Sequence, residues 1–342
     1  MTADSLYLDH AATTPLLPAA REAMLEGFAI WANPSSPHKA GRVARASLED
    51  ARSRIAAALG WSGEVILTSG ASEALALALT RCIQPLAAVG VAEHEAVLRY
   101  AAGAGRLGVS CAGLVDPVEA ALGGLVAVQQ VNNETGVIQR LDEIGAAVHR
   151  AGGLLLADCA QGAGKLPLPD ADLIAISAHK FGGPVGIGAL LVRDYVMLRP
   201  DGGQERGYRG GTENLPGALA MVAALEQGPA WLTEAARLRT RLEAGVLAGG
   251  GQVVAAQSER IATIGAYRMP GVSSAAQLIR FDAQNIAVSA GSACSSGSLR
   301  TSHVLEAMGV EGAGEVIRVS IGRETTAAEI DRFLEAWQGI AP

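Results

Sequence analysis

The chain has 342 residues, of which 49% are apolar and 42 are glycine, and its formal net charge is −7 at pH 7. This length exceeds the size at which a single hydrophobic core usually stops growing, so two lobes are expected. An acidic balance without any basic run argues against nucleic acid as a direct partner.

Targeting and membrane segments are not expected either. Residues 1–9 lack a basic stretch followed by an apolar one, so the sequence predicts no signal peptide, and no apolar run approaches the ~20 residues of a membrane span. The cysteines Cys82, Cys111, Cys159 and Cys294 lack metal-like spacing, so we expect free thiols, no metal site and a cytoplasmic protein.

Apolar runs of strand length alternate along the chain with stretches of helical periodicity. In chain order, we expect helices over Pro18–Gly27 and Arg42–Leu59, a strand over Val65–Thr68, a helix over Ser72–Cys82, a strand over Leu125–Val131, a helix over Leu141–Ala151, strands over Leu154–Ala157, Leu173–Ser177 and Ile187–Val192, and a helix over Leu215–Glu226. This alternation predicts a mainly parallel sheet with helices on both faces. A short glycine-rich turn between the last two strands predicts an antiparallel hairpin. From about residue 230, a charged helix over Leu232–Leu247 and mixed pieces after it predict a smaller α+β lobe.

A lysine stands directly after one of these strands. Lys180 follows Ser177 and His179 and precedes a glycine-rich turn. A positioned, partly desolvated amine beside hydrogen-bond donors suits a Schiff base with a phosphorylated aldehyde, pyridoxal 5′-phosphate. The residues alone leave open a surface lysine at a strand end.

Two other strand ends carry groups that fit such a cofactor. The segment Thr68–Glu73 opens a helix, whose unpaired amides with the Ser72 hydroxyl make an anion site, although capping by Ser69 or Ser72 is the alternative. Asp158 ends an apolar strand 22 residues before Lys180 and could keep a pyridinium nitrogen protonated, with Gln161 on the ring hydroxyl. A helix cap or a metal ligand is the alternative for Asp158, and metal is disfavoured because no second ligand lies nearby.

Four further segments are weaker indications. His94 could stack on a ring and carry protons, or be structural. Asn133 ends a strand where such folds bind ligands, or belongs to a turn. The glycine- and arginine-rich loop over residues 202–214 could bind anions or lie solvated on the surface. Cys294 stands in a run of small residues that would expose a nucleophile, or in a linker.

Arg318 interrupts a strand-like alternation near the C-terminal end. The guanidinium group of Arg318 suits a substrate carboxylate, which it can bind through two hydrogen bonds. The alternative is a side chain that reaches from a strand edge into solvent.

The order of these segments resembles the class V aminotransferase family and, within it, the NifS-like cysteine desulfurases. The matching pieces, which span nearly the whole chain, are Tyr7–Pro15, Asn33–His38 with Gly41, Thr68–Glu73, Glu93-His94, Val131–Gly136, Asp158–Gln161, Ser177–Pro184, Gln204–Asn214, Ser292–Ser298 and Ile317-Arg318.

The resemblance implies the α/β type I fold of pyridoxal-phosphate-dependent transferases. A large cofactor-binding domain would span residues 15–230, and a small domain with the cysteine loop would combine residues 1–14 and 231–342. The implied cofactor contacts are Lys180 at the aldehyde, Asp158 at the ring nitrogen, Gln161 at the ring hydroxyl, His94 stacked on the ring, Asn133 beside it, and Ala71, Ser72, Ser177 and His179 at the phosphate. Thr212 would reach the phosphate of a second subunit in a homodimer.

The resemblance also implies the reaction. L-Cysteine, held by Asn133 and Arg318, would become L-alanine, with Lys180 and His94 moving protons and Cys294 becoming a persulfide. The sulfur would pass to an acceptor or scaffold protein for iron–sulfur cluster assembly or tRNA thiolation. An aminotransferase, a selenocysteine lyase and a non-enzymatic sulfur relay are the competing readings.

Overall fold

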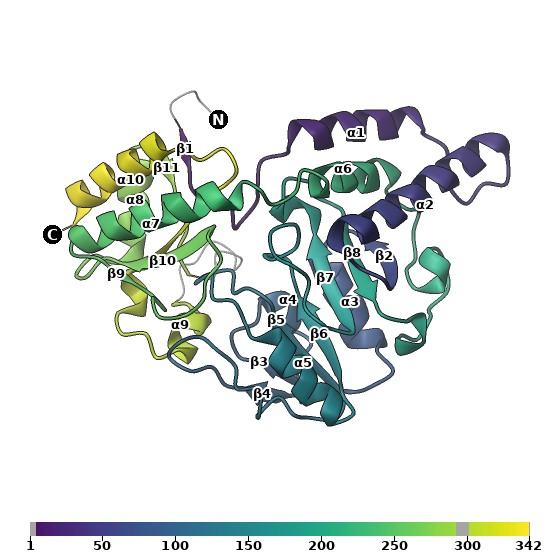
Figure 1. Cartoon of the computed structure of the whole chain (residues 1–342), viewed down its shortest axis with the longest axis horizontal. Coiled ribbons are helices and arrows are strands. Elements are labelled where there is room, and N and C mark those ends of the chain that lie inside the picture. Colours follow the sequence, from purple (N-terminus) through teal and green to yellow (C-terminus); the bar gives the residue numbers. More distant parts are fainter. Residues whose placement is uncertain (1–4, 292–300, 342) are drawn as a thin grey trace.

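Two lobes lie side by side (Figure 1), in a computed structural model that describes residues 5–291 and 301–341. The larger lobe is built on one sheet of seven strands within these residues, in the order β2-β8-β7-β6-β5-β3-β4. The strands are β2 (Glu64–Thr68), β3 (Leu86–Gly90), β4 (Gly105–Leu107), β5 (Leu125–Gln129), β6 (Leu154–Asp158), β7 (Leu173–Ser177) and β8 (Gly188–Val192). β8 runs antiparallel to β2 and β7, while the other pairings are parallel. The predicted parallel sheet and its hairpin are therefore confirmed.

Helices cover both faces of this sheet, as the fully apolar strands require. Along β2, Val65 and Leu67 belong to a core with α1 (Pro18–Ala29), α2 (Lys39–Leu59), α5 (Leu141–Arg150) and α6 (Leu215–Leu225). Ile66, between them, packs on the opposite face with α3 (Ala71–Arg81) and α4 (Glu95–Leu98). Each such buried side chain stabilises the fold by about 1.5–3 kcal/mol.

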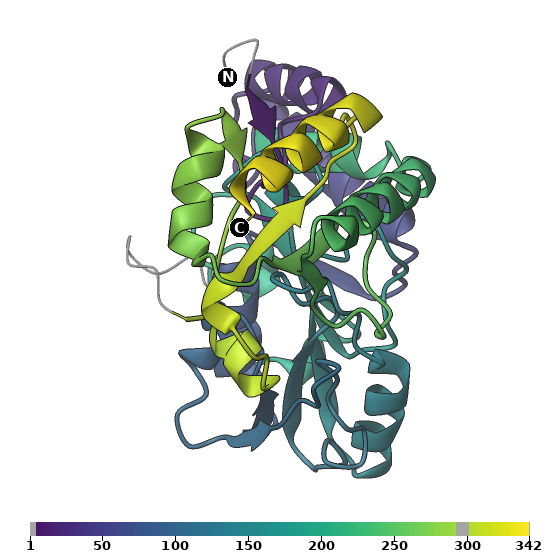
Figure 2. The same cartoon turned by 90° about the vertical axis from the view of Figure 1, so that its left-hand side faces the viewer.

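The smaller lobe has its own hydrophobic core. An antiparallel sheet of β9 (Gln252–Val253), β10 (Ile264–Arg268) and β12 (Val316–Ser320) carries α7 (Leu232–Ala248), α8 (Ser274–Asp282), α9 (His303–Ala307) and α10 (Ala327–Ile340). β1 (Leu6–Tyr7) joins this lobe by parallel pairing with β11 (Ile286–Ala287), so the N-terminal strand lies beside the C-terminal elements (Figure 2). Phe281 and Phe333 stack in its core with ring centroids 5.0 Å apart. This separate core supports the proposed division of residues 1–14 and 231–342 from 15–230.

The strands β2, β5, β6 and β7 run in the same direction, so their carboxyl ends lie at one edge of the sheet. The N-terminal segment after β1 reaches this edge, because the backbone N–H of Thr14 donates to the carbonyl of His179 at 2.8 Å. Residues from both lobes are therefore available there. Within the described residues, no helix has the length and apolar character to span a membrane.

Candidate functional site

Lys180 lies in a short 3-10 turn, Ala178–Lys180, directly after β7. Its ammonium donates to the carbonyl oxygens of Ala11 at 2.6 Å and Ala12 at 2.8 Å, and the Thr14 hydroxyl donates to the Lys180 carbonyl at 3.2 Å. The turn requires glycine at Gly182, where φ is +92° and a Cβ would lie 2.5 Å from the Leu17 side chain. The N-terminal segment therefore holds the lysine at the carboxyl edge of the sheet.

Asp158 ends β6 and is buried beside this lysine. Its Oδ1 accepts a hydrogen bond from the backbone N–H of Ala160 at 2.9 Å. Burial raises the pKa of the Asp158 carboxyl, while the Ala160 bond and the nearby His94 and Lys180 oppose that rise. A buried carboxylate at this place favours a cationic ligand group.

His94 and Gln161 flank the same edge. His94 precedes α4, and its Nδ1 accepts from the backbone N–H of Ala96 at 3.1 Å, so a neutral ring carries its proton on Nε2. Gln161 donates from Nε2 to the Ala11 carbonyl at 2.9 Å, while its buried Oε1 has no partner among the described residues. That acceptor suits a hydroxyl ligand, because buried polar atoms are normally hydrogen-bonded.

The start of α3 forms an uncapped helix N-terminus next to Ser177. Gly70 is the N-cap and provides no side-chain hydrogen bond, so capping by Ser69 or Ser72 is the wrong alternative. The amides of Ala71 and Ser72 follow at the first two helical positions. A Cβ on Gly70 would lie 3.4 Å from the Ser177 Oγ, so the serine hydroxyl and these amides converge. This geometry suits an anion such as phosphate.

His179 lies at the same turn as Lys180. Its Nδ1 is 3.2 Å from the Thr13 hydroxyl, which leaves Nε2 for another group. Burial first, and then Lys180 and Lys165, lower the pKa of His179 to about 4. A neutral imidazole is therefore expected near pH 7, able to donate one hydrogen bond.

Arg318 on β12 is buried and held by two contacts. Its Nη1 donates to the Asn133 carbonyl at 2.9 Å, and its Nη2 donates to Asp9 Oδ1 at 2.8 Å, so the reading of a side chain reaching into solvent is wrong. Its buried Nε has no partner among the described residues. Asn132 builds the turn beneath it, because Oδ1 accepts from the backbone N–H groups of Glu134 and Thr135. Asn133 is thereby both a turn residue and a site neighbour.

The loop over residues 202–214 is anchored at Glu205. The Glu205 carboxylate is buried against Arg52 of α2, with Nη1–Oε2 at 2.7 Å, and also accepts from the backbone N–H of Leu67 at 2.8 Å. A loop that is solvated throughout is therefore the wrong reading. Thr212 itself is exposed in a groove beside Trp31, away from the residues that surround Lys180.

The prediction of free thiols is confirmed for the cysteines that the structure describes. Cys82, Cys111 and Cys159 are free thiols, of which Cys111 is exposed. Cys294 lies outside the described residues.

Three residues of this region were not predicted as site residues; Glu93 and Lys165 are buried, and Asp9 is partly exposed. Asp9 pairs with Arg318, Glu93 accepts from the Gln129 backbone N–H at 2.9 Å with its pKa raised well above the ordinary value by burial, and Lys165 is buried near Lys180. Asp9 and Glu93 lie within the segments Tyr7–Pro15 and Glu93-His94 that carry the resemblance, and this location could have indicated that they belong to the site.

Comparison with known protein families shows the family of this chain. The family model described as aminotransferase class-V matches residues 6–333. The chain belongs to this family. The cysteine desulfurase of Gluconacetobacter diazotrophicus is 36% identical over 98% of this chain and 93% of its own length, and the cysteine desulfurase IscS of an Anaeromyxobacter species is 38% identical over 96% and 90%.

Solved structures agree on the fold. The NifS-like protein of Rickettsia africae superposes with a TM-score of 0.90 at 29% identity, covering 98% of this chain and 99% of the other. Within the class-V aminotransferases, this chain is therefore of the cysteine desulfurase type and has the type I fold of pyridoxal-phosphate-dependent enzymes.

Proposed function

We propose that this protein is a pyridoxal 5′-phosphate-dependent cysteine desulfurase that converts L-cysteine to L-alanine and leaves the sulfur as a persulfide on Cys294. The observation that carries the proposal is the placement of Lys180 beside the buried carboxylate of Asp158 at the carboxyl edge of the sheet. A solved relative titled SspA in complex with cysteine, 27% identical with a TM-score of 0.81, supports L-cysteine as the substrate.

The residues present fit this cofactor on three observations. Asp158 offers a buried carboxylate to a protonated ring nitrogen, and the unpartnered Oε1 of Gln161 suits the ring hydroxyl. The uncapped start of α3 with Ser177 suits the phosphate. Ala71, Ser72, Ser177 and His179 would thus hold the phosphate, His94 would stack on the ring, Asn133 would lie beside it and Lys180 would bind the aldehyde.

When bound, pyridoxal phosphate supplies an electron sink for the α-carbon of the substrate. Arg318 and Asn133 hold the substrate carboxylate, with the Arg318 fork aimed by Asp9. Lys180 takes the α-proton, and His94 Nε2 carries a proton along the path. The Cys294 thiolate attacks the substrate sulfur, the carbon–sulfur bond breaks with its electron pair going to carbon, and that carbon gains a proton as alanine forms.

We propose that the sulfur then passes to an acceptor or scaffold protein for iron–sulfur cluster assembly or tRNA thiolation.

The test is the Cys294→Ala variant. We expect it to keep the visible absorbance of bound cofactor and to lose sulfide release from L-cysteine in the presence of a thiol reductant, because the sulfur no longer has an acceptor. Cys111→Ala, which removes an exposed thiol elsewhere, is the matched control and should release sulfide normally. Normal turnover by Cys294→Ala would contradict the assigned role, and turnover that required an added keto acid would indicate an aminotransferase.

We further propose a homodimer, in which Thr212 completes the phosphate site of the second subunit. Apolar side chains gather on and after α1, where Phe28 is 59% and Trp31 83% exposed. They line a groove of about 340 Å³ that also contains Thr212. Exposed apolar patches of this kind mark protein interfaces, and the position of Thr212 within the patch favours a second copy of the chain as the occupant.

Trp31→Asp is expected to weaken the dimer by at least about 30-fold, because buried tryptophans at interface centres contribute roughly 2 kcal/mol or more. Light scattering across a dilution series measures this, and cofactor affinity should fall together with the dimer. Val118→Asp is the control, since Val118 is 80% exposed outside this groove. Equal dimer affinity in both variants would refute the assignment of this surface.

A further inference from the structure

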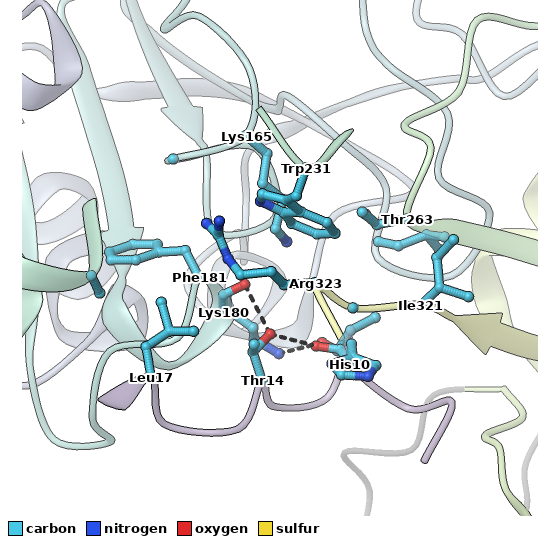
Figure 3. A pocket seen from close by; sticks show the side chains of 15 residues that line it. His10, Thr14, Leu17, Lys165, Lys180, Phe181, Trp231, Thr263, Ile321 and Arg323 are labelled. Atoms are coloured by element: carbon cyan, nitrogen blue, oxygen red, sulfur yellow. Dashed lines mark hydrogen bonds between the residues drawn. The ribbon is translucent and has the colours of Figure 1, made fainter. Parts of the chain in front are cut away.

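A small cavity lies between the two lobes, on the side of Lys180 that also contains Lys165 (Figure 3). We call it the interlobe cavity, and the residues that matter for it are His10, Lys165, Lys180, Trp231, Thr263 and Arg323. It leaves about 20 Å³ for the centre of a water-sized molecule. That is room for roughly one water or one ion of similar size.

Lys165 is buried at this cavity. Its side chain is contributed by the large lobe, the residue is 8% exposed, and its ammonium has no hydrogen bond to any described residue. Burial, and then the charge of Lys180, lower the pKa of Lys165 to about 7. An ammonium buried without a counter-charge is costly, so the site favours an anion beside it.

Two more basic groups face the same space. Arg323 comes from the segment after β12, donates from Nη2 to the Gly228 carbonyl at 2.9 Å and lies 5.4 Å from the centre of the Trp231 ring. Burial lowers the pKa of Arg323. The buried Nδ1 of His10 has no partner among the described residues, and burial, followed by Lys165, lowers the pKa of His10 to about 4.

Among the described residues, no acidic side chain balances these groups at the cavity. None of the lining residues in the described chain is an aspartate or a glutamate. Figure 3 places Lys165 and Trp231 on one side of the cavity, Arg323 in its middle, and His10 with Thr14 on the other side. The space is therefore small and desolvated, and it is lined by the basic side chains of Lys165 and Arg323 beside a neutral His10.

We propose that the interlobe cavity binds one small monovalent inorganic anion, of about the size of chloride, between Lys165 and Arg323. The cavity is too small for phosphate or sulfate. Because no carboxylate lines it among the described residues, the ligand must supply the negative charge. Because Lys165 belongs to the large lobe and Arg323 to the small lobe, the bound anion bridges them. The proposal does not depend on the activity proposed above.

The first test uses crystals of the holoprotein grown without halide and soaked in sodium bromide. An anomalous difference peak between Lys165 and Arg323 is expected, and the same soak of Lys165→Met crystals should lack it. Bromide found only at the surface, or a peak that persists unchanged in Lys165→Met, overturns the proposal.

The second test works in solution and needs no variant. The chain contains only three lysines, Lys39, Lys165 and Lys180, so lysine labelled with ¹³C at Cε gives few, assignable signals. Sodium bromide replacing gluconate at constant ionic strength is expected to raise the titration midpoint of Lys165 by about one to three pH units. Exposed Lys39 is the internal control and should not move. If bromide did not change the titration midpoint of Lys165, the cavity would contain a neutral amine and water, and the anion site would be refuted.

Discussion

Asp158→Asn is expected to lower kcat/KM for L-cysteine by about 10²- to 10³-fold, the usual loss when one buried electrostatic contact to a reacting system is removed. Asparagine keeps the shape of the side chain and one oxygen for the Ala160 N–H, which Asp158 binds at 2.9 Å. It loses the negative charge that would hold a proton on the cofactor ring nitrogen. Cofactor should therefore still bind through Lys180 and the phosphate contacts, and visible spectra measure this separately from turnover.

The chain offers a matched control for this substitution. Asp116 also accepts a backbone hydrogen bond from the residue two positions on, with Oδ1 at 2.8 Å from the Val118 nitrogen, but it is exposed. Asp116→Asn should leave both spectrum and turnover unchanged. If Asp158→Asn retained wild-type kcat/KM with a full complement of cofactor, the role of Asp158 at the ring nitrogen would be excluded.

The positions of Lys180, Asp158 and Ser177 could be predicted because each lies at or just after the end of a strongly apolar strand. Because β6 and β7 are parallel and end at one edge of the sheet, Asp158 is brought close to Ser177 and Lys180 by topology alone. The strands β3 and β4 were not predicted. β4 has three residues and lies at the edge of the sheet, and β3 beside it contains two alanines and ends at Gly90.

Helix α2 illustrates how close packing at a helix start outweighs a low helix propensity. The sequence predicts its start at Arg42, whereas the helix begins at Lys39 and includes Gly41 in its first turn, although glycine disfavours helix. The ring of His38 accepts from the Gly41 N–H at 3.2 Å, and a Cβ at Gly41 would lie 2.2 Å from the Ser36 carbonyl oxygen. Glycine is needed there for close packing, which no periodicity in the sequence reveals.

The roles of Asp9 and Lys165 were beyond local reasoning for a related cause. Asp9 and Arg318 are 309 positions apart in sequence, so neither residue predicts its contact with the other. Lys165 stands among glycines and prolines, a setting typical of an exposed loop, and only the packing of both lobes buries it. Contacts between lobes decide charge burial, and they are set by the fold as a whole.

Lys165→Met is expected to stabilise the folded protein at pH 6 in halide-free buffer. Burial places the pKa of Lys165 at about 7, against an ordinary value of 10.5. Below pH 7 the amine is charged in both the folded and the unfolded states, and the folded state bears the full cost of burying it. A difference of about 3.5 units corresponds to roughly 5 kcal/mol, which is an upper bound because a charged site can admit water.

The sign of the pH dependence follows from proton counts. Between about pH 7 and pH 10.5 the unfolded chain carries a proton on Lys165 that the folded chain lacks, so the wild-type free energy of unfolding rises with pH relative to Lys165→Met. The advantage of the variant should therefore be largest near pH 6 and shrink towards pH 10. Urea unfolding of both proteins across this range measures the difference in their free energies of unfolding. For Lys39→Met, at an exposed site, the difference from wild type should not change with pH. A gap for Lys165→Met that did not change with pH would show that Lys165 keeps its ordinary pKa in the folded protein.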